Sequence, residues 1–205
     1  YSCNQTGSST DTNCMSCDNA NGFYLVEGRS SSNCVSSVSD PGYYLNTGEK
    51  MFKKCYVSCK TCSALGTSSD NKCGICNSTN GYYPVVDKAN QCLQSIYGYY
   101  LDKSGGSPDS YIWKHCNQAC VSCNQSSTSS DTNCMACNYD GQYYPVESRS
   151  ASNCLKNFGE VGYYLSTSER LWKKCYESCK TCNETGTSRA NKCMTCLYTS
   201  QFYPI

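Results

Sequence analysis

The sequence has no long hydrophobic run and few of the residues that build an ordinary protein core. Of its 205 residues only 4 are methionine, 4 phenylalanine and 2 tryptophan, and leucine, isoleucine and valine are scarce as well. No apolar stretch is long enough to cross a bilayer, and no segment shows a sustained helical period. We therefore expect neither a membrane-spanning helix in these residues nor a helical core.

The chain also lacks histidine, apart from His115, and has no excess of either charge. A single histidine excludes a His-dependent catalytic triad or a His-based metal site that repeats along the chain. A net charge of +1 excludes strong electrostatic attraction to nucleic acid or to an acidic membrane. The sequence thus predicts no enzyme, no catalytic or metal-binding residue, no cofactor and no nucleic-acid partner.

What the chain has instead is 21 cysteines in a fixed rhythm. A complete repeat contains six, separated in order by 3, 2, 10, 2 and 15 or 16 residues. A fixed period is the signature of a tandem-repeat protein. The first copy lacks its opening two cysteines, two complete copies begin at Cys55 and Cys116, and the fourth begins at Cys175 and lacks its last cysteine.

These copies predict four repeat units: residues 1–54, 55–115, 116–174 and 175–205. Both ends of the chain fall inside a repeat, so we expect a longer protein in which any membrane anchor lies outside these residues. Repeats 1 and 3 (type A) align without a gap at an offset of 120 residues, and so do repeats 2 and 4 (type B). This alternation indicates either two distinct environments or a recent duplication of a pair.

The composition indicates an extracellular or cell-surface protein. Cysteine at about a tenth of all positions is typical of disulfide-rich secreted chains. Four Asn-x-Ser/Thr sequons agree with this, and three of them occupy the same place, directly after the third cysteine of a repeat. We therefore predict a glycoprotein with N-linked glycans at Asn4, Asn77, Asn124 and Asn183.

Tyrosine takes the place of the missing aliphatic residues. Two adjacent aromatic residues recur twice in each complete repeat, and most of these pairs follow a glycine. Glycine, two aromatic residues and then leucine or proline are typical of a turn that leads into a short strand. The expected fold class is therefore a small disulfide-rich one of β-hairpins and loops, arranged as an elongated rod of tandem repeats without a conventional core.

The spacing resembles that of furin-like cysteine-rich repeats, which occur in growth-factor receptor ectodomains, in R-spondins and in surface proteins of ciliates and other protists. The residues that carry the resemblance are Cys55-Tyr-Val-Ser-Cys59-Lys-Thr-Cys62, Cys73-Gly-Ile-Cys76, Gly81-Tyr82-Tyr83, Cys92 and Gly98-Tyr99-Tyr100. The resemblance implies stacked hairpins without catalytic activity. It also implies that the first cysteine of a repeat pairs with the third, the second with the fourth and the fifth with the sixth.

Six cysteines allow 15 connectivities, so spacing alone does not choose one. The pairing implied by the resemblance predicts the bonds Cys17–Cys34, Cys55–Cys62, Cys59–Cys73, Cys76–Cys92, Cys116–Cys123, Cys120–Cys134, Cys137–Cys154, Cys175–Cys182 and Cys179–Cys193. Each bridge contributes about 2–4 kcal/mol, enough to replace a missing core. The family often adds a disulfide in the spacer after the sixth cysteine; none is available here, so packing or a neighbour must hold that hairpin.

A zinc site is the alternative to disulfides. Cys59, Cys62, Cys73 and Cys76 have a spacing that four thiolates around zinc also use, and the spacing recurs in repeats 3 and 4. Zinc would leave the first and sixth cysteines of each repeat as free thiols. The regular sequons also indicate an oxidising compartment, so the sequence favours disulfides over zinc.

Two classes of function fit these features. One is an extracellular glycosylated structural protein that forms a filament, hair or surface coat, with further repeats and copies of itself as partners. The other is a cysteine-rich binding ectodomain, such as a receptor stalk or a variable surface antigen. A binding array usually needs one repeat with a distinctive surface. The uniform repetition and dense tyrosine favour the structural reading.

Overall fold

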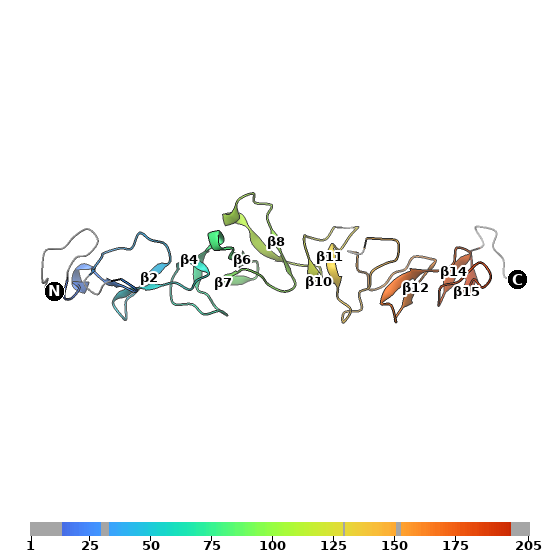
Figure 1. The fold of residues 1–205 in the computed structure, drawn as a ribbon, viewed down its shortest axis with the longest axis horizontal. Coiled ribbons are helices and arrows are strands. Elements are labelled where there is room, and N and C mark those ends of the chain that lie inside the picture. The colour runs from blue at the N-terminus through green and yellow to red at the C-terminus, as the bar shows by residue number, and fades with distance from the viewer. Residues whose placement is uncertain (1–13, 30–32, 129, 151–152, 198–205) are drawn as a thin grey trace. The chain divides into compact units, whose positions relative to one another are not determined.

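The computed structural model describes residues 14–29, 33–128, 130–150 and 153–197 (Figure 1). Within these ranges the chain forms short strands joined by loops and by single turns of 3-10 helix. In chain order the elements are η1 (Asn19–Asn21), β1 (Leu25–Val26), β2 (Tyr43–Asn46), β3 (Met51–Lys54), β4 (Cys59–Cys62), β5 (Cys73–Cys76), η2 (Ser78–Asn80), β6 (Tyr83–Val85), β7 (Lys88–Leu93), β8 (Tyr99–Asp102), η3 (Pro108–Ser110), β9 (Ile112–His115), β10 (Cys120–Cys123), β11 (Cys134–Cys137), β12 (Tyr163–Ser166), β13 (Leu171–Lys174), β14 (Cys179–Cys182) and β15 (Cys193–Cys196).

One kind of hairpin, the knot hairpin, is built from the two Cys-x-x-Cys motifs of a repeat. Strand β4 pairs antiparallel with β5, β10 with β11, and β14 with β15. In the first of these hairpins Cys59 lies opposite Cys76 and Cys62 lies opposite Cys73, and the other two keep the same register. Cysteines three positions apart therefore stand at the two ends of one short strand.

A second kind, the spacer hairpin, begins at the Gly-Tyr-Tyr motif that precedes each knot. Strands β2 and β3 pair antiparallel, and so do β12 and β13, while β8 lies beside β9. Tyr100 is buried against the disulfides of repeat 3, and Tyr164 packs against those of repeat 4. Neighbouring rings point elsewhere: Tyr99 lies on His115, with ring centroids 4.1 Å apart, and Tyr163 meets Phe158 edge-on. The predicted class of small disulfide-rich hairpins is confirmed.

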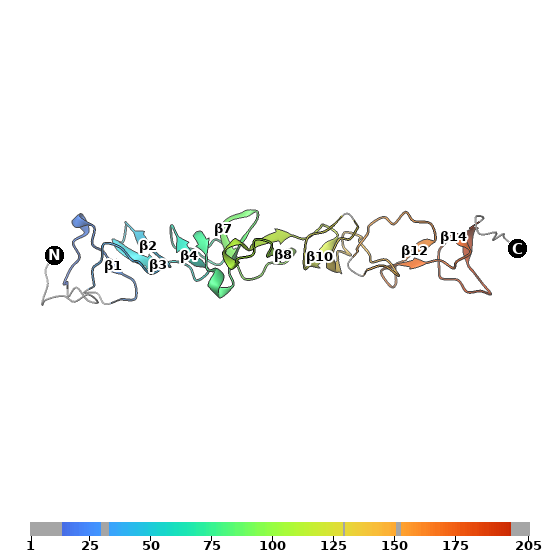
Figure 2. The same ribbon diagram turned by 90° about the horizontal axis from the view of Figure 1, so that it is seen from above.

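Parallel pairing joins each spacer hairpin to the hairpin that precedes it along the chain. Strand β1 pairs parallel with β3, so that the sheet has the order β1-β3-β2 (Figure 2). Strand β6 pairs parallel with β9 in a sheet of order β7-β6-β9-β8, and a parallel bridge links Val146 to Trp172. The valine at each joint is almost fully buried: Val26, Val85 and Val146 are 3%, 4% and 2% exposed.

The cores of repeats 2, 3 and 4 consist mainly of disulfides. In repeat 2 the buried residues Cys59, Cys73 and Cys92 form a cluster that Tyr56 and Tyr82 cover. Repeats 3 and 4 have equivalent clusters of half-cystines and tyrosine rings. Sulfur and aromatic carbon thus fill the small volume that leucine and isoleucine fill in larger domains.

The chain divides into two compact units, one of Tyr1–Ser95 with Asp102–Trp113 and the other of Ile96–Leu101 with Lys114–Ile205. The division falls within the β8–β9 hairpin rather than at a cysteine. In the described part of the chain, no helix has the length and apolar character that crossing a membrane requires.

Candidate interaction surface and modification sites

The disulfides link the first cysteine with the third, the second with the fourth and the fifth with the sixth. The bonded pairs are Cys17–Cys34, Cys55–Cys62, Cys59–Cys73, Cys76–Cys92, Cys116–Cys123, Cys120–Cys134, Cys137–Cys154, Cys175–Cys182 and Cys179–Cys193. The cysteines with zinc-like spacing are therefore divided among different bonds, because Cys62 pairs with Cys55 and Cys76 with Cys92. Their sulfurs are not available as thiolate ligands.

A buried polar side chain ties the loop between the third and fourth cysteines to the strand that carries the sixth. In repeat 2, Asn71 Oδ1 accepts a hydrogen bond from the backbone N–H of Cys92 at 2.6 Å, and its Nδ2 donates to the carbonyl of Thr67 at 2.9 Å. In repeat 3 the aligned residue is Thr132, whose Oγ1 accepts from the N–H of Cys154 at 2.8 Å. Repeats 2 and 3 thus satisfy the same buried N–H with different residues.

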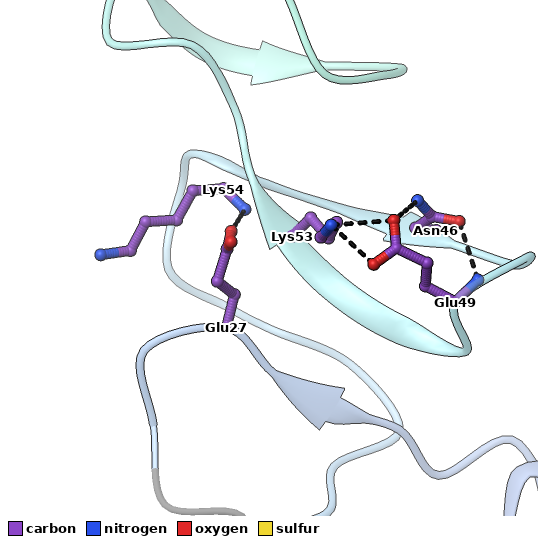
Figure 3. A network of polar contacts seen from close by, with 5 residues as sticks. All are labelled: Glu27, Asn46, Glu49, Lys53 and Lys54. Carbon is purple, nitrogen blue, oxygen red and sulfur yellow. Dashed lines mark hydrogen bonds and ion pairs between the residues drawn. The ribbon is translucent and has the colours of Figure 1, made fainter.

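In type A repeats a glutamate completes the joint between hairpins. Glu27 accepts a hydrogen bond from the backbone N–H of Lys54 at 2.7 Å (Figure 3), and Glu147 accepts from that of Lys174 at the same distance. The parallel pairing leaves this N–H at the end of the strand, where the carboxylate satisfies it. Sequence inspection missed the glutamates, although both follow the aligned valines Val26 and Val146.

A second carboxylate orders the turn of the type A spacer hairpin. Lys53 donates from Nζ to both oxygens of Glu49, at 2.8 and 2.7 Å, and Asn46 bonds the same glutamate through its side chain (Figure 3). The hydrogen bond to Glu49 raises the pKa of Lys53 above its ordinary value of 10.5, and Glu169 does the same for Lys173 in repeat 3.

In repeats 1 and 3 an ion pair links the loop before the sixth cysteine to the spacer after it. Arg29 bonds Asp40 at 2.5 Å in repeat 1, and Arg149 bonds Glu160 in repeat 3. The Arg149 guanidinium also lies 4.9 Å from the ring centroid of Phe158. Packing within the chain therefore contributes to holding the type A spacer in place.

The spacer of repeat 2 is held differently. Ser78, in η2, donates a hydrogen bond to Asp109, in η3, and the rings of Tyr83 and Tyr111 lie 5.6 Å apart. Beside these contacts is a hollow of about 260 Å³. Its walls include Ile75, Tyr82, Tyr83, Pro84, Pro108 and Asp109.

The aromatic residue three positions before the first cysteine of repeats 2, 3 and 4 anchors the spacer hairpin that precedes that cysteine. The indole N–H of Trp113 donates to the carbonyl of Leu93 at 2.9 Å, and that of Trp172 donates to the carbonyl of Leu155 at 3.2 Å. Phe52, in the aligned position of repeat 1, meets Tyr24 edge-on. These side chains therefore pack within the chain, next to the strand that carries the sixth cysteine.

The sequons differ in their surroundings. Asn124 and Asn183 are exposed, whereas Asn77 is half-buried and donates from Nδ2 to the carbonyl of Val57 at 3.5 Å. Asn138, which has the same place in repeat 3 and belongs to no sequon, donates to the carbonyl of Gln118 at 3.1 Å. Asn77 therefore occupies a structural position. Asn4 lies outside the described residues.

Comparison with known proteins identifies the chain as a cysteine-rich repeat array. It is 29% identical over 175 residues to the human extracellular matrix organizing protein FRAS1, a match that covers 85% of this chain and 4% of that protein. It is 26% identical over 172 residues to cysteine repeat modular protein 2 of Tetrahymena thermophila, covering 79% of this chain and 8% of the relative. No family model and no solved structure matches the chain.

Proposed function

We propose that this cysteine-rich repeat array is a structural component of an extracellular matrix or cell-surface coat, in which copies of the chain associate, and that it has no catalytic activity. The observation that carries the proposal is the repeated joint. Val26, Val85 and Val146 each pair in parallel with the strand before the next knot. A joint built the same way each time suits an array whose parts have a mechanical rather than a chemical role.

The disulfides support an extracellular location. The described residues alone form nine bridges, a density typical of proteins in an oxidising compartment. The names of the two relatives, one a matrix organizing protein and the other a cysteine repeat modular protein, agree with this. The chain corresponds to 4% and 8% of these relatives, so their own activities do not transfer to it.

N-linked glycans belong to the same proposal. Asn124 and Asn183 follow the third cysteine of their repeats, are exposed, and begin loops rich in serine and threonine. Glycopeptide mass spectrometry of the secreted chain should find both occupied, and Asn77 should be occupied least because its amide is engaged with Val57. Bare asparagines at 124 and 183 would remove the glycoprotein part of the proposal.

Association is tested with the whole 205-residue chain, secreted from glycosylating cells and studied by light scattering, sedimentation and electron microscopy. We expect the mean mass to rise with concentration and side-by-side or end-to-end assemblies to appear. A monodisperse monomer at every concentration would contradict the structural proposal. It would leave the binding ectodomain as the better reading.

A further inference from the structure

The spacer hairpin of repeat 2 has a longer turn than the spacer hairpins of repeats 1 and 3. Nine residues, 103–111, separate β8 from β9, whereas four residues separate β2 from β3 and β12 from β13. The longer turn includes η3 and folds back on its own repeat, where Asp109 accepts the hydrogen bond from Ser78. The ring of Tyr111 also lies 5.6 Å from that of Tyr83. The additional residues therefore form a held segment rather than a free loop.

This turn forms one side of the hollow in repeat 2. Pro108 and Asp109 come from the turn, and the other lining residues come from β5, from η2 and from residues 82–84. The four-residue turns of repeats 1 and 3 have no counterpart of these two turn residues. The volume of about 260 Å³ lies below the range of about 300–1,000 Å³ that is typical of pockets for drug-sized ligands. A hollow of this size suits one side chain of a partner.

The lining of the hollow combines ring-bearing residues with one charge. The ring-bearing residues are Tyr82, Tyr83, Pro84 and Pro108. Of the described residues that line the hollow, Asp109 alone is charged; its Oδ1 accepts from Ser78, and its second oxygen is available to a ligand. Lys103, a cation of the same turn, does not line the hollow and lies 5.9 Å from the ring centroid of Tyr111. A carboxylate next to aromatic rings attracts a cation and repels an anion.

Repeat 3 shows which cation this chain holds between a carboxylate and an aromatic ring. Arg149 bonds Glu160, and its guanidinium lies 4.9 Å from the ring centroid of Phe158. A planar guanidinium can stack on a ring and bond a carboxylate at the same time, which the compact ammonium group of lysine does less well. Repeats 1, 3 and 4 each contain arginine, whereas residues 55–115 contain none. Repeat 2 therefore has the carboxylate and the rings without an arginine of its own.

We propose that the hollow of repeat 2 binds an arginine side chain of a partner protein, with the guanidinium bonded to Asp109 and stacked on the tyrosine rings. The aliphatic stem of the arginine then contacts Ile75 and Pro84, which also line the hollow. This site adds a specific binding activity to the structural role proposed above, and that role does not depend on it. One side chain alone makes little contact, so we expect a dissociation constant on the order of 1 mM for a minimal ligand.

The test measures binding of the peptide acetyl-Gly-Arg-Gly-amide to the whole secreted chain by saturation-transfer NMR, which observes the peptide in the presence of dilute protein. The same peptide with citrulline in place of arginine keeps the shape of the side chain and removes its charge. We expect the citrulline peptide to bind about tenfold more weakly, because it loses both the ion pair and the cation–π contact. Equal binding of the two peptides, or no binding of either, would overturn the inference.

Two variants locate the binding. Asp109→Asn should weaken binding of the arginine peptide by about threefold to fivefold, whereas the matched control Asp70→Asn removes a charge of the same repeat outside the hollow and should change nothing. Replacing residues 103–111 with Thr-Gly-Glu-Lys, the turn of repeat 1, removes one side of the hollow and should abolish binding.

Disulfide mapping of the turn replacement should return the wild-type bonds, because repeat 1 forms its spacer hairpin with this short turn. Wild-type binding by a correctly bonded turn replacement would show that the peptide binds elsewhere and would overturn the inference. If the turn replacement misfolds, Asp109→Asn decides: binding as strong as that of Asp70→Asn would overturn the inference, and weaker binding would support it.

Discussion

Asn71 and Cys92, 21 positions apart in the sequence, share the hydrogen bond that closes repeat 2. Asn71 is 1% exposed, and its Oδ1 lies 2.6 Å from the backbone nitrogen of Cys92. The bond satisfies a buried N–H beside the disulfide Cys76–Cys92 and fixes the loop after the third cysteine at the same time. Thr132 and Cys154 form the corresponding bond in repeat 3.

Replacing Asn71 with alanine should destabilise repeat 2 by about 1–3 kcal/mol, because the N–H of Cys92 is left buried without an acceptor. Asn71→Thr should cost less, since a threonine hydroxyl accepts the equivalent bond in repeat 3. Denaturant unfolding followed by near-ultraviolet circular dichroism measures both. Asn191→Ala is the control: Asn191 is exposed, and its loss should cost less than that of Asn71.

Gly66 should tolerate no side chain, because a Cβ there would lie 1.9 Å from the carbonyl oxygen of Asn71. Gly66→Ala must displace the loop backbone, and we expect a loss of about 1–3 kcal/mol, typical of overpacking. Gly159→Ala is the matched control, because no atom lies within 4 Å of its Cβ position. Equal stability of the two variants would contradict the close approach of Gly66 to Asn71.

The ion pair of Lys53 and Glu49 should make the type A spacer hairpin sensitive to alkali. The pKa of Lys53 is raised above 10.5 by its hydrogen bond to Glu49. The stabilisation is therefore complete below pH 10.5 and is lost as the pH rises through the raised value. NMR titration of the lysine side chains should show the raised pKa, and Glu49→Gln should lower it. Lys173 keeps its partner Glu169 in that variant, so its pKa should not change.

A reductant should unfold this protein, whereas a chelator should have no effect on its fold. The cysteine sulfurs with zinc-like spacing are joined in disulfides such as Cys59–Cys73 and Cys120–Cys134. EDTA should therefore leave the NMR spectrum unchanged, whereas a phosphine reductant should collapse it, because little apolar core remains once the bridges open. Loss of the fold on chelation alone would show that a metal holds the repeats.

For some side chains the sequence shows that they recur from repeat to repeat but does not show which residues they contact. The glutamates Glu27 and Glu147 and the arginines Arg29 and Arg149 recur at the same offset as the cysteines, so the pattern was present but gave no partner. The partners are 27 and 11 positions away, and only the fold brings them together. Repeat 2 looked as uniform as the others by its cysteines; its exposed Leu65 and Ile75 set it apart.

The sequence by itself determined the repeat, the hairpin class and the disulfide-rich character, because cysteine spacing and the Gly-Tyr-Tyr motif are local signals that survive without a partner. The tertiary structure decided how hairpins join. The parallel pairings of Val26 with Phe52 and of Val85 with Trp113 link segments more than 20 residues apart. The sequence of either segment does not identify its pairing partner. It also decided that Asn77 is a structural residue, since the carbonyl of Val57 that its amide bonds is 20 positions away.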